Sequence, residues 1–250
     1  MINREIFLVT GASSGLGLAV ANALIHNGHE VILVARNESK LKEICAQQPQ
    51  QTSYICGDLS QESFVRYLVS KLPENLSGAF INAGGPPAKT TAETTLEDWD
   101  NAYNLLIRWK VQLTRELIPL FQKQGYGRIL YSESTSVTRP VENLALSNSL
   151  RMAIVGLTRT LVNEYKNSGI TFNVLAPGYH ETKALERLYD KLSQQQSITV
   201  DKARELIAKK IPTGSTGDVL HYASLACWLL GSQSDFITGQ VINVDGGVSI

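Results

Sequence analysis

The residues whose types and spacing best suit chemistry lie between Thr10 and Gly17. This run reads Thr-Gly-Ala-Ser-Ser-Gly-Leu-Gly and follows the apolar stretch 6–9, which is expected to form a strand. Gly11 permits a tight turn, Gly15 lets a diphosphate approach the backbone, and Gly17 lets the following helix pack closely. Free N–H groups and the helix dipole then favour an anion, so the run predicts a phosphate-binding turn.

Other polar motifs stand where later apolar runs end. The carboxyl ends of parallel strands meet at one edge of a sheet, so these motifs are expected to gather there around a ligand. They are Arg36, Asp58 with Leu59, Asn82-Ala83-Gly84, Ser134 and Pro177-Gly178-Tyr179-His180-Glu181-Thr182.

Length and composition favour one domain, 1–250, because no linker or low-complexity stretch divides the chain. The 23 basic and 23 acidic residues are interspersed, which argues against a nucleic-acid or membrane partner. No apolar run approaches the roughly 18 residues of a membrane span, and residues 1–5 do not resemble a signal peptide. Cys45, Cys56 and Cys227 have neither metal nor disulfide spacing, so we expect no metal and a cytoplasmic location.

The elements that must position these motifs alternate along the chain. Continuous apolar strands are typical of a parallel sheet that helices cover on both faces. Repeated β-α units therefore predict an α/β fold, a single Rossmann-type doubly wound domain with a seven-stranded parallel sheet. The expected strands are 6–9, 31–34, 53–56, 79–81, 129–131, 171–174 and 241–244, and the clearest helical patterns cover 18–26, 64–72, 96–122, 144–167 and 218–230.

The motifs together resemble the short-chain dehydrogenase/reductase family over essentially the whole chain. The resemblance rests on Thr10 with the Gly-x-x-x-Gly-x-Gly spacing, on Asn82-Ala83-Gly84, and on the segments 177–182 and 237–247. It implies a nicotinamide dinucleotide cofactor, a small-molecule substrate and a homodimer or homotetramer. The cofactor-binding residues that it implies are Gly11, Ser13, Ser14, Gly15, Leu16, Gly17, Asp58, Leu59, Asn82, Ala83, Gly84, Arg151, Pro177, Gly178 and Thr182.

Two residues that follow expected strands bear on how the dinucleotide is bound, and the first of them on which dinucleotide it is. Arg36 follows the second expected strand, where an acidic residue would hold the ribose hydroxyls of NAD. An arginine can instead pair with the 2′-phosphate of NADP, so NADP is expected and NAD is less favoured. In the family, an Asp at the position of Asp58 accepts a hydrogen bond from adenine, although Asp58 would equally suit a helix cap near Ser60.

The catalytic tetrad of the family, Asn-Ser-Tyr-Lys, is incomplete in this chain. The family's spacing places Leu106 at the Asn position, Ser134 at the Ser position, Ser147 at the Tyr position and Arg151 at the Lys position. A serine hydroxyl is a far weaker acid than a phenol, whose ordinary pKa is about 10. Arg151 keeps a positive charge but does not shuttle protons. The expected catalytic residues are therefore Ser134, Ser147 and Arg151 in an atypical site.

Five further side chains are possible substitutes for the missing acid, but each is more simply explained as structural or solvated. They are Tyr103, Lys110, Glu133, Tyr179 and His180, the last expected to lie on the surface.

The chain resembles a beta-ketoacyl carrier-protein reductase-like subgroup with imperfect tetrads, which favours an NADP-dependent carbonyl or alcohol oxidoreductase. A non-redox isomerase, dehydratase or cyclase and a non-catalytic cofactor-binding subunit remain open. The charged stretch 183–210 interrupts the β-α alternation, and it is interpreted as a substrate lid or a pair of solvated surface helices.

Overall fold

The seven apolar runs form one parallel sheet in the computed structural model, which describes residues 4–250. The sheet order is β3-β2-β1-β4-β5-β6-β7, so the winding reverses between β1 and β4 and opens a crevice at the carboxyl ends of these strands. The expected strands are confirmed, and all but the last are longer than expected. The strands are β1 (Ile6–Thr10), β2 (Glu30–Ala35), β3 (Thr52–Cys56), β4 (Leu76–Asn82), β5 (Gly127–Ser132), β6 (Ile170–Pro177) and β7 (Val241–Val244).

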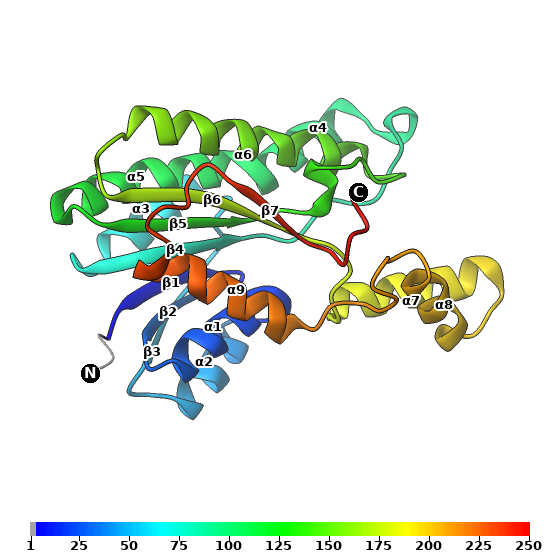
Figure 1. The fold of residues 1–250 in the computed structure, drawn as a ribbon, viewed down its shortest axis with the longest axis horizontal. Helices are drawn as coiled ribbons and strands as arrows, with labels where there is room; N and C mark the ends of the chain where they lie inside the picture. Colours follow the sequence, from blue (N-terminus) through cyan, green and yellow to red (C-terminus); the bar gives the residue numbers. More distant parts are fainter. Residues whose placement is uncertain (1–3) are drawn as a thin grey trace.

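Helices cover both faces of the sheet (Figure 1). One face packs against α1 (Gly15–His26), α2 (Glu38–Gln47) and α9 (Val219–Leu230). The other face packs against α3 (Glu62–Ser70), α5 (Trp109–Gln124) and α6 (Ala145–Glu164), with α4 (Leu96–Tyr103) beside α6. The expected helix 96–122 is α4 and α5 joined by a π-helical turn, Asn104–Arg108. Short 3-10 turns occur at Thr91–Glu93, Thr135–Val137 and Ser232–Ser234.

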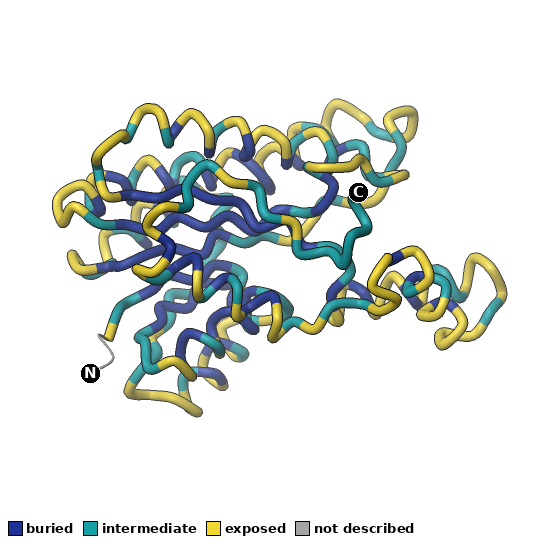
Figure 2. The backbone as a smooth tube through the Cα atoms, in the orientation of Figure 1, coloured by how far each residue is buried: buried dark blue, intermediate teal, exposed yellow. Residues whose placement is uncertain are grey.

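Burial on both faces explains why the strands are continuously apolar. Phe7 and Val9 point toward α1 and α9, whereas Leu8 between them points toward α3 and α5. Figure 2 shows the five central strands, from β2 to β6 in the sheet order, as the most buried part of the fold. No helix in residues 4–250 combines the length and apolar character needed to cross a membrane.

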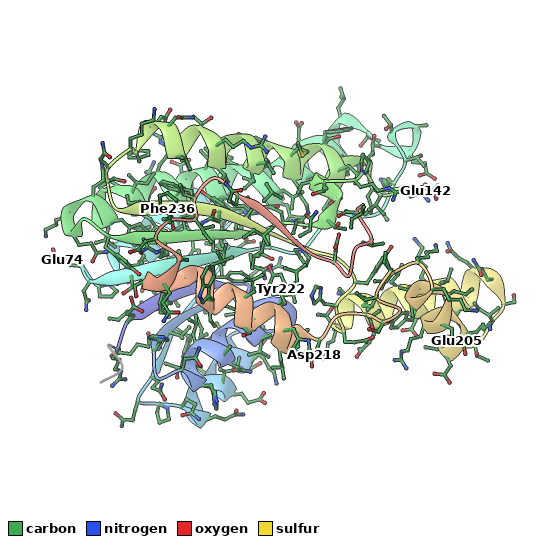
Figure 3. The ribbon with its side chains drawn as sticks, in the orientation of Figure 1. Glu74, Glu142, Glu205, Asp218, Tyr222 and Phe236 are labelled. Atoms are coloured by element: carbon green, nitrogen blue, oxygen red, sulfur yellow. The ribbon has the colours of Figure 1, made fainter. Side chains whose placement is uncertain are left out.

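The stretch 183–210 forms two helices, α7 (Lys183–Gln196) and α8 (Val200–Ala208), that project beyond the sheet (Figure 1). They share a small core of their own, made by Leu185, Tyr189, Ala203, Ile207 and Ile211. The chain segments that enter and leave this arm pair at its stem, where Gly217 N–H donates to the Tyr179 carbonyl at 2.8 Å. Figure 3 places Asp218 where the chain returns from the arm into α9.

Candidate active site

The glycine turn has the backbone shape that the sequence predicts. Gly11 and Gly15 have φ values of +62° and +56°, in the left-handed region that favours glycine. Thr10 ties β1 to β4, because its hydroxyl donates to the Asn82 carbonyl at 2.9 Å and accepts from the Asn82 N–H at 2.8 Å. The N-cap residue of α1, Ser14, makes no side-chain cap, and no acid occupies the first turn. The first N–H groups of α1 are therefore available to an anion.

A groove of about 680 Å³ runs along the carboxyl edge of the sheet, where the sequence predicts a ligand. The predicted site residues line it with one exception. Gly17 does not line the groove: a Cβ at this position would lie 2.3 Å from the Gly11 carbonyl oxygen, so this glycine serves the close packing of α1 on the turn. The predicted residues in the lining are Gly11, Ser13, Ser14, Gly15, Leu16, Arg36, Asp58, Leu59, Asn82, Ala83, Gly84, Ser134, Ser147, Arg151, Pro177, Gly178 and Thr182.

The charge of the groove is predominantly positive. Arg36, Lys183 and Arg187 line it, and none has a carboxylate partner within residues 4–250. Asp58 also lines the groove, and its Oδ1 accepts from the Ser60 N–H at 2.9 Å. It does not cap α3, whose N-cap is Gln61. Such a groove suits a ligand with several negative charges.

Ser134, Ser147 and Arg151 come together at one end of the groove, as the sequence predicts for catalytic residues. Arg151 of α6 donates from Nε to Ser147 Oγ at 3.1 Å and from a terminal nitrogen to the Gly84 carbonyl at 3.5 Å. Ser134 follows β5, and its Oγ accepts from the Ser136 N–H at 3.1 Å. The register of β4 and β5 sets Asn82 beside Ser132, which brings both loops to this end.

A buried ion-pair network lies behind these residues. One oxygen of Glu133 is 2.5 Å from Lys110 Nζ, and the other is 2.9 Å from Arg151. The side chains of Lys110 and Glu133 are fully buried. Burial lowers the pKa of Lys110, although the neighbouring Glu133 opposes that effect. Lys110 and Glu133 are paired in the interior, so neither is solvated. The network holds the Arg151 guanidinium in one position.

His180 is not the surface residue that the sequence suggests. It is 5% exposed, lines the groove and packs its ring against Tyr222, with centroids 5.3 Å apart. The reason is the stem of the arm, where His180 pairs with Gly217. A Cβ at Gly217 would lie 2.8 Å from the imidazole, so only glycine leaves room for it. Burial lowers the pKa of His180.

The two tyrosines considered as substitute acids lie in different surroundings. Tyr103 is 46% exposed, and it lines a separate hollow with Arg108 and Arg115 rather than the groove. Tyr179 lines a smaller hollow of about 250 Å³ that adjoins the groove at Ser134. Burial raises the pKa of Tyr179. The two hollows share Ser134, Pro177 and Gly178 in their linings.

Comparisons with known proteins agree with this architecture. A family model described as enoyl-(acyl carrier protein) reductase matches residues 11–249. The 3-oxoacyl-(acyl-carrier-protein) reductase of Rickettsia felis is 32% identical over 96% of this chain and 95% of its own length. The crystal structure of an actinorhodin polyketide ketoreductase with NADPH superposes with a TM-score of 0.92 at 26% identity, covering 100% of this chain and 98% of that chain.

This chain belongs to the short-chain dehydrogenase/reductase family. A further solved member, the 3-ketoacyl-(acyl-carrier-protein) reductase from Brucella melitensis complexed with NADH, is 25% identical with a TM-score of 0.88 and covers 100% of both chains. Within the short-chain dehydrogenase/reductase fold, three of the four expected tetrad positions meet at the groove. The fourth, Leu106, is fully buried in the π-helical turn and does not line it.

Sequence reasoning missed several groove residues of this short-chain dehydrogenase/reductase. Leu105 and Trp109 come from the π-helical turn and the start of α5, and no local pattern marks them. Lys183 and Arg187 lie one turn apart on α7. Their four-residue spacing in the sequence could have predicted that both cations lie on one face of a helix.

Proposed function

We propose that the protein is an NADP(H)-dependent oxidoreductase that transfers a hydride between the cofactor and a small carbonyl compound or alcohol. The observation that carries this proposal is the groove. It joins an uncapped helix N-terminus, the positive-φ glycines and Arg36 to a cluster of hydroxyl and guanidinium donors. The NADPH in the related ketoreductase supports the same cofactor here.

The residues present suit each part of the dinucleotide. The turn from Gly11 to Leu16, which includes the start of α1, would hold the diphosphate, and Arg36 would hold the 2′-phosphate. Asp58 with Leu59 would contact adenine. Asn82-Ala83-Gly84 and Arg151 would contact the nicotinamide ribose, and Pro177, Gly178 and Thr182 would hold the carboxamide.

The bound cofactor supplies a hydride, and the chain's own residues act on the oxygen of the substrate. Ser134 and Ser147 would donate hydrogen bonds to this oxygen, and Arg151 would stabilise its developing negative charge. The absence of a tyrosine at Ser147 favours a second candidate, cofactor binding without turnover. The two candidate functions, hydride transfer and cofactor binding without turnover, differ in whether NADPH is oxidised in the presence of a carbonyl substrate.

We propose that α7 and α8 form a lid over the substrate, since Thr182 at the base of α7 approaches the glycine turn. A Cβ at Gly15 would lie 3.7 Å from the Thr182 methyl group. We further propose a cytoplasmic homodimer or homotetramer, as the family resemblance implies.

The proposal is tested by titrating the purified protein with NADPH and with NADH while following nicotinamide fluorescence. We expect saturable binding with a lower dissociation constant for NADPH. Failure to bind either dinucleotide would exclude the proposed function, and equal affinity for both would exclude the role of Arg36.

A further inference from the structure

The smaller hollow beside Ser134 contains a single cation. Arg139 is the one charged side chain in its lining, and no carboxylate from residues 4–250 lines it. The other lining side chains are apolar or carry a hydroxyl group. Apolar walls lower the local dielectric constant, so a cation beside them attracts an anion more strongly than a cation in open solvent does. The hollow therefore suits a ligand with one negative charge.

Most of the Arg139 guanidinium is free to bind such a ligand. One terminal nitrogen donates to the backbone oxygen of Ile250 at 2.9 Å. A guanidinium has five N–H donors. Within residues 4–250 the other donors of Arg139 have no acceptor, and no Asp or Glu side chain forms an ion pair with it. Asp245, which does not line the hollow, already accepts from the Thr135 hydroxyl at 2.8 Å and from the Gly247 N–H at 2.9 Å.

The hollow joins this cation to the reactive end of the groove. Ser134 borders both spaces, and the 3-10 turn Thr135–Val137 lies between Ser134 and Arg139 in the chain. Such a turn advances by about 2 Å per residue, which is about 6 Å over its three residues. A molecule that contacts both polar groups therefore needs a spacer between its own two polar ends. Apolar side chains in the lining suit a hydrocarbon spacer, namely Val141, Leu144 and Val248.

We infer that the substrate is a small oxo acid, with its carbonyl oxygen at Ser134 and Ser147 and its carboxylate at Arg139. Two or more carbon atoms separate the two groups. The inference rests on the proposed NADP(H)-dependent function. A carboxylate fits better than a phosphate, because the planar guanidinium fork matches two carboxylate oxygens and a single cation does not balance a phosphate dianion. The hollow, at about 250 Å³, is smaller than a pocket for a drug-sized ligand, so the acid is short.

The reaction converts the oxo acid into a hydroxy acid. The carbonyl carbon gains a hydride, and the π pair of the carbonyl group moves to the oxygen beside Ser134 and Ser147. Water supplies the proton that completes the hydroxyl group. The carbonyl carbon is reduced by two electrons, and NADPH is oxidised by two. The carboxylate takes no part in the bond changes, and its contact with Arg139 positions the carbonyl group.

The first experiment compares acids with uncharged compounds of nearly the same shape. Reduction of 4-oxopentanoate and 5-oxohexanoate by NADPH is measured beside reduction of their amides and of pyruvate, whose two polar groups are adjacent. We expect kcat/KM for the two longer acids to exceed that for the amides by about 10- to 100-fold. Equal values for acids and amides, or a preference for pyruvate, would overturn the inference and leave the proposed oxidoreductase in place. No reduction of any of the five compounds would overturn the proposed hydride transfer together with the inference.

A binding measurement assigns the contact to Arg139 without turnover. NADP⁺ cannot donate a hydride, so its complex with the protein is titrated calorimetrically with 5-oxohexanoate and with 5-oxohexanamide. Arg139→Gln should lower the ratio of the two affinities by about 10- to 100-fold, and Arg139→Lys, which keeps the charge without the fork, should lower it less. Arg159→Gln, which removes an exposed cation from α6, is the matched control. The NADP⁺ affinity of each variant reports whether its fold is intact. An Arg139→Gln variant that binds NADP⁺ and keeps the wild-type ratio would contradict the assignment.

Discussion

Arg151 shows how one residue organises the reactive end of the groove. Its guanidinium contacts Ser147, Glu133 and the Gly84 carbonyl, which belong to α6 itself and to the loops after β5 and β4. A lysine has a single ammonium group and lacks the planar fork that makes these contacts together. Arg151 therefore links both loops to α6 and places a positive charge between them.

Arg36 should determine the cofactor preference. Arg36→Asp is expected to weaken NADPH binding by about 10- to 100-fold, because a charge-assisted contact to the 2′-phosphate is lost and repulsion replaces it. NADH binding should change little. Dissociation constants from fluorescence titration check this, with Arg159→Asp on the exposed side of α6 as a control. An equal loss of affinity for NADPH and NADH would show a general effect on folding instead.

Gly17 should be needed for packing rather than for ligand contact. In Gly17→Ala the added methyl group would collide with the Gly11 carbonyl, so the glycine turn or α1 must shift. We expect a loss of about 1–3 kcal/mol in the free energy of unfolding and weaker dinucleotide binding. Denaturant unfolding measures the first effect. Gly156→Ala, on an exposed part of α6 where a Cβ would meet nothing, should cause no loss.

Burial of His180 should make stability depend on pH. Desolvation lowers the pKa of His180 in the folded protein, although Asp218 and Asp245 oppose this, and it also lowers the pKa of His29. The unfolded chain then binds protons first as the pH falls below about 6.5, so the free energy of unfolding falls with it. Replacement by a leucine, His180→Leu, should reduce this slope by up to about 1.4 kcal/mol per pH unit. Unfolding curves between pH 7 and 5 test this, and an unchanged slope would contradict it.

At the scale of elements, the arm formed by α7 and α8 carries cations toward the groove. Lys183 and Arg187 line the groove from the first turns of α7, next to the glycine turn. The phosphates of a bound dinucleotide would therefore attract α7 as well as the N-terminus of α1.

Neutralising these cations should weaken cofactor binding. Lys183→Gln and Arg187→Gln are each expected to raise the NADPH dissociation constant by about two- to fivefold, a modest effect because both side chains are exposed. The salt dependence of binding should also decrease. Titrations at low and high salt measure both effects. Lys191→Gln, on the same helix but outside the groove, should leave affinity unchanged. An equal change in the NADPH dissociation constant in all three variants would argue against a contact between α7 and the cofactor.

At the scale of the whole molecule, exposed apolar side chains mark possible contact surfaces between copies. Tyr103 on α4 and Met152 on α6 are 46% and 44% exposed. Phe236, labelled in Figure 3 between α9 and β7, is fully exposed. Symmetric contacts through surfaces of this kind would build the homodimer or homotetramer that the family resemblance implies.

We therefore expect light scattering to give two or four times the chain mass of 27.4 kDa. Met152→Glu and Phe236→Asp should each lower the assembled mass if the residue lies in an interface, because a charge would be buried there. A monomer at micromolar concentration would contradict the prediction.

The sequence by itself determined the strands, the glycine turn and the edge of the sheet where the groove lies. These features depend on local rules: continuous apolar runs, the left-handed backbone of Gly11 and Gly15, and the parallel winding of β-α units. The groove motifs at the ends of β1 to β6 were predictable for the same reason, whereas Ser147 and Arg151 of α6 were assigned from the family resemblance.

The tertiary structure alone decided which distant side chains share a buried environment. Lys110, Glu133 and Arg151 come from α5, the end of β5 and α6, and only the packing of α5 and α6 against the sheet brings their charges within reach. His180 looked like a surface residue because its burial depends on Gly217, at the far end of the arm in sequence but beside it in space. Contacts between residues far apart in sequence depend on how helices and strands pack, and local sequence patterns do not predict that packing.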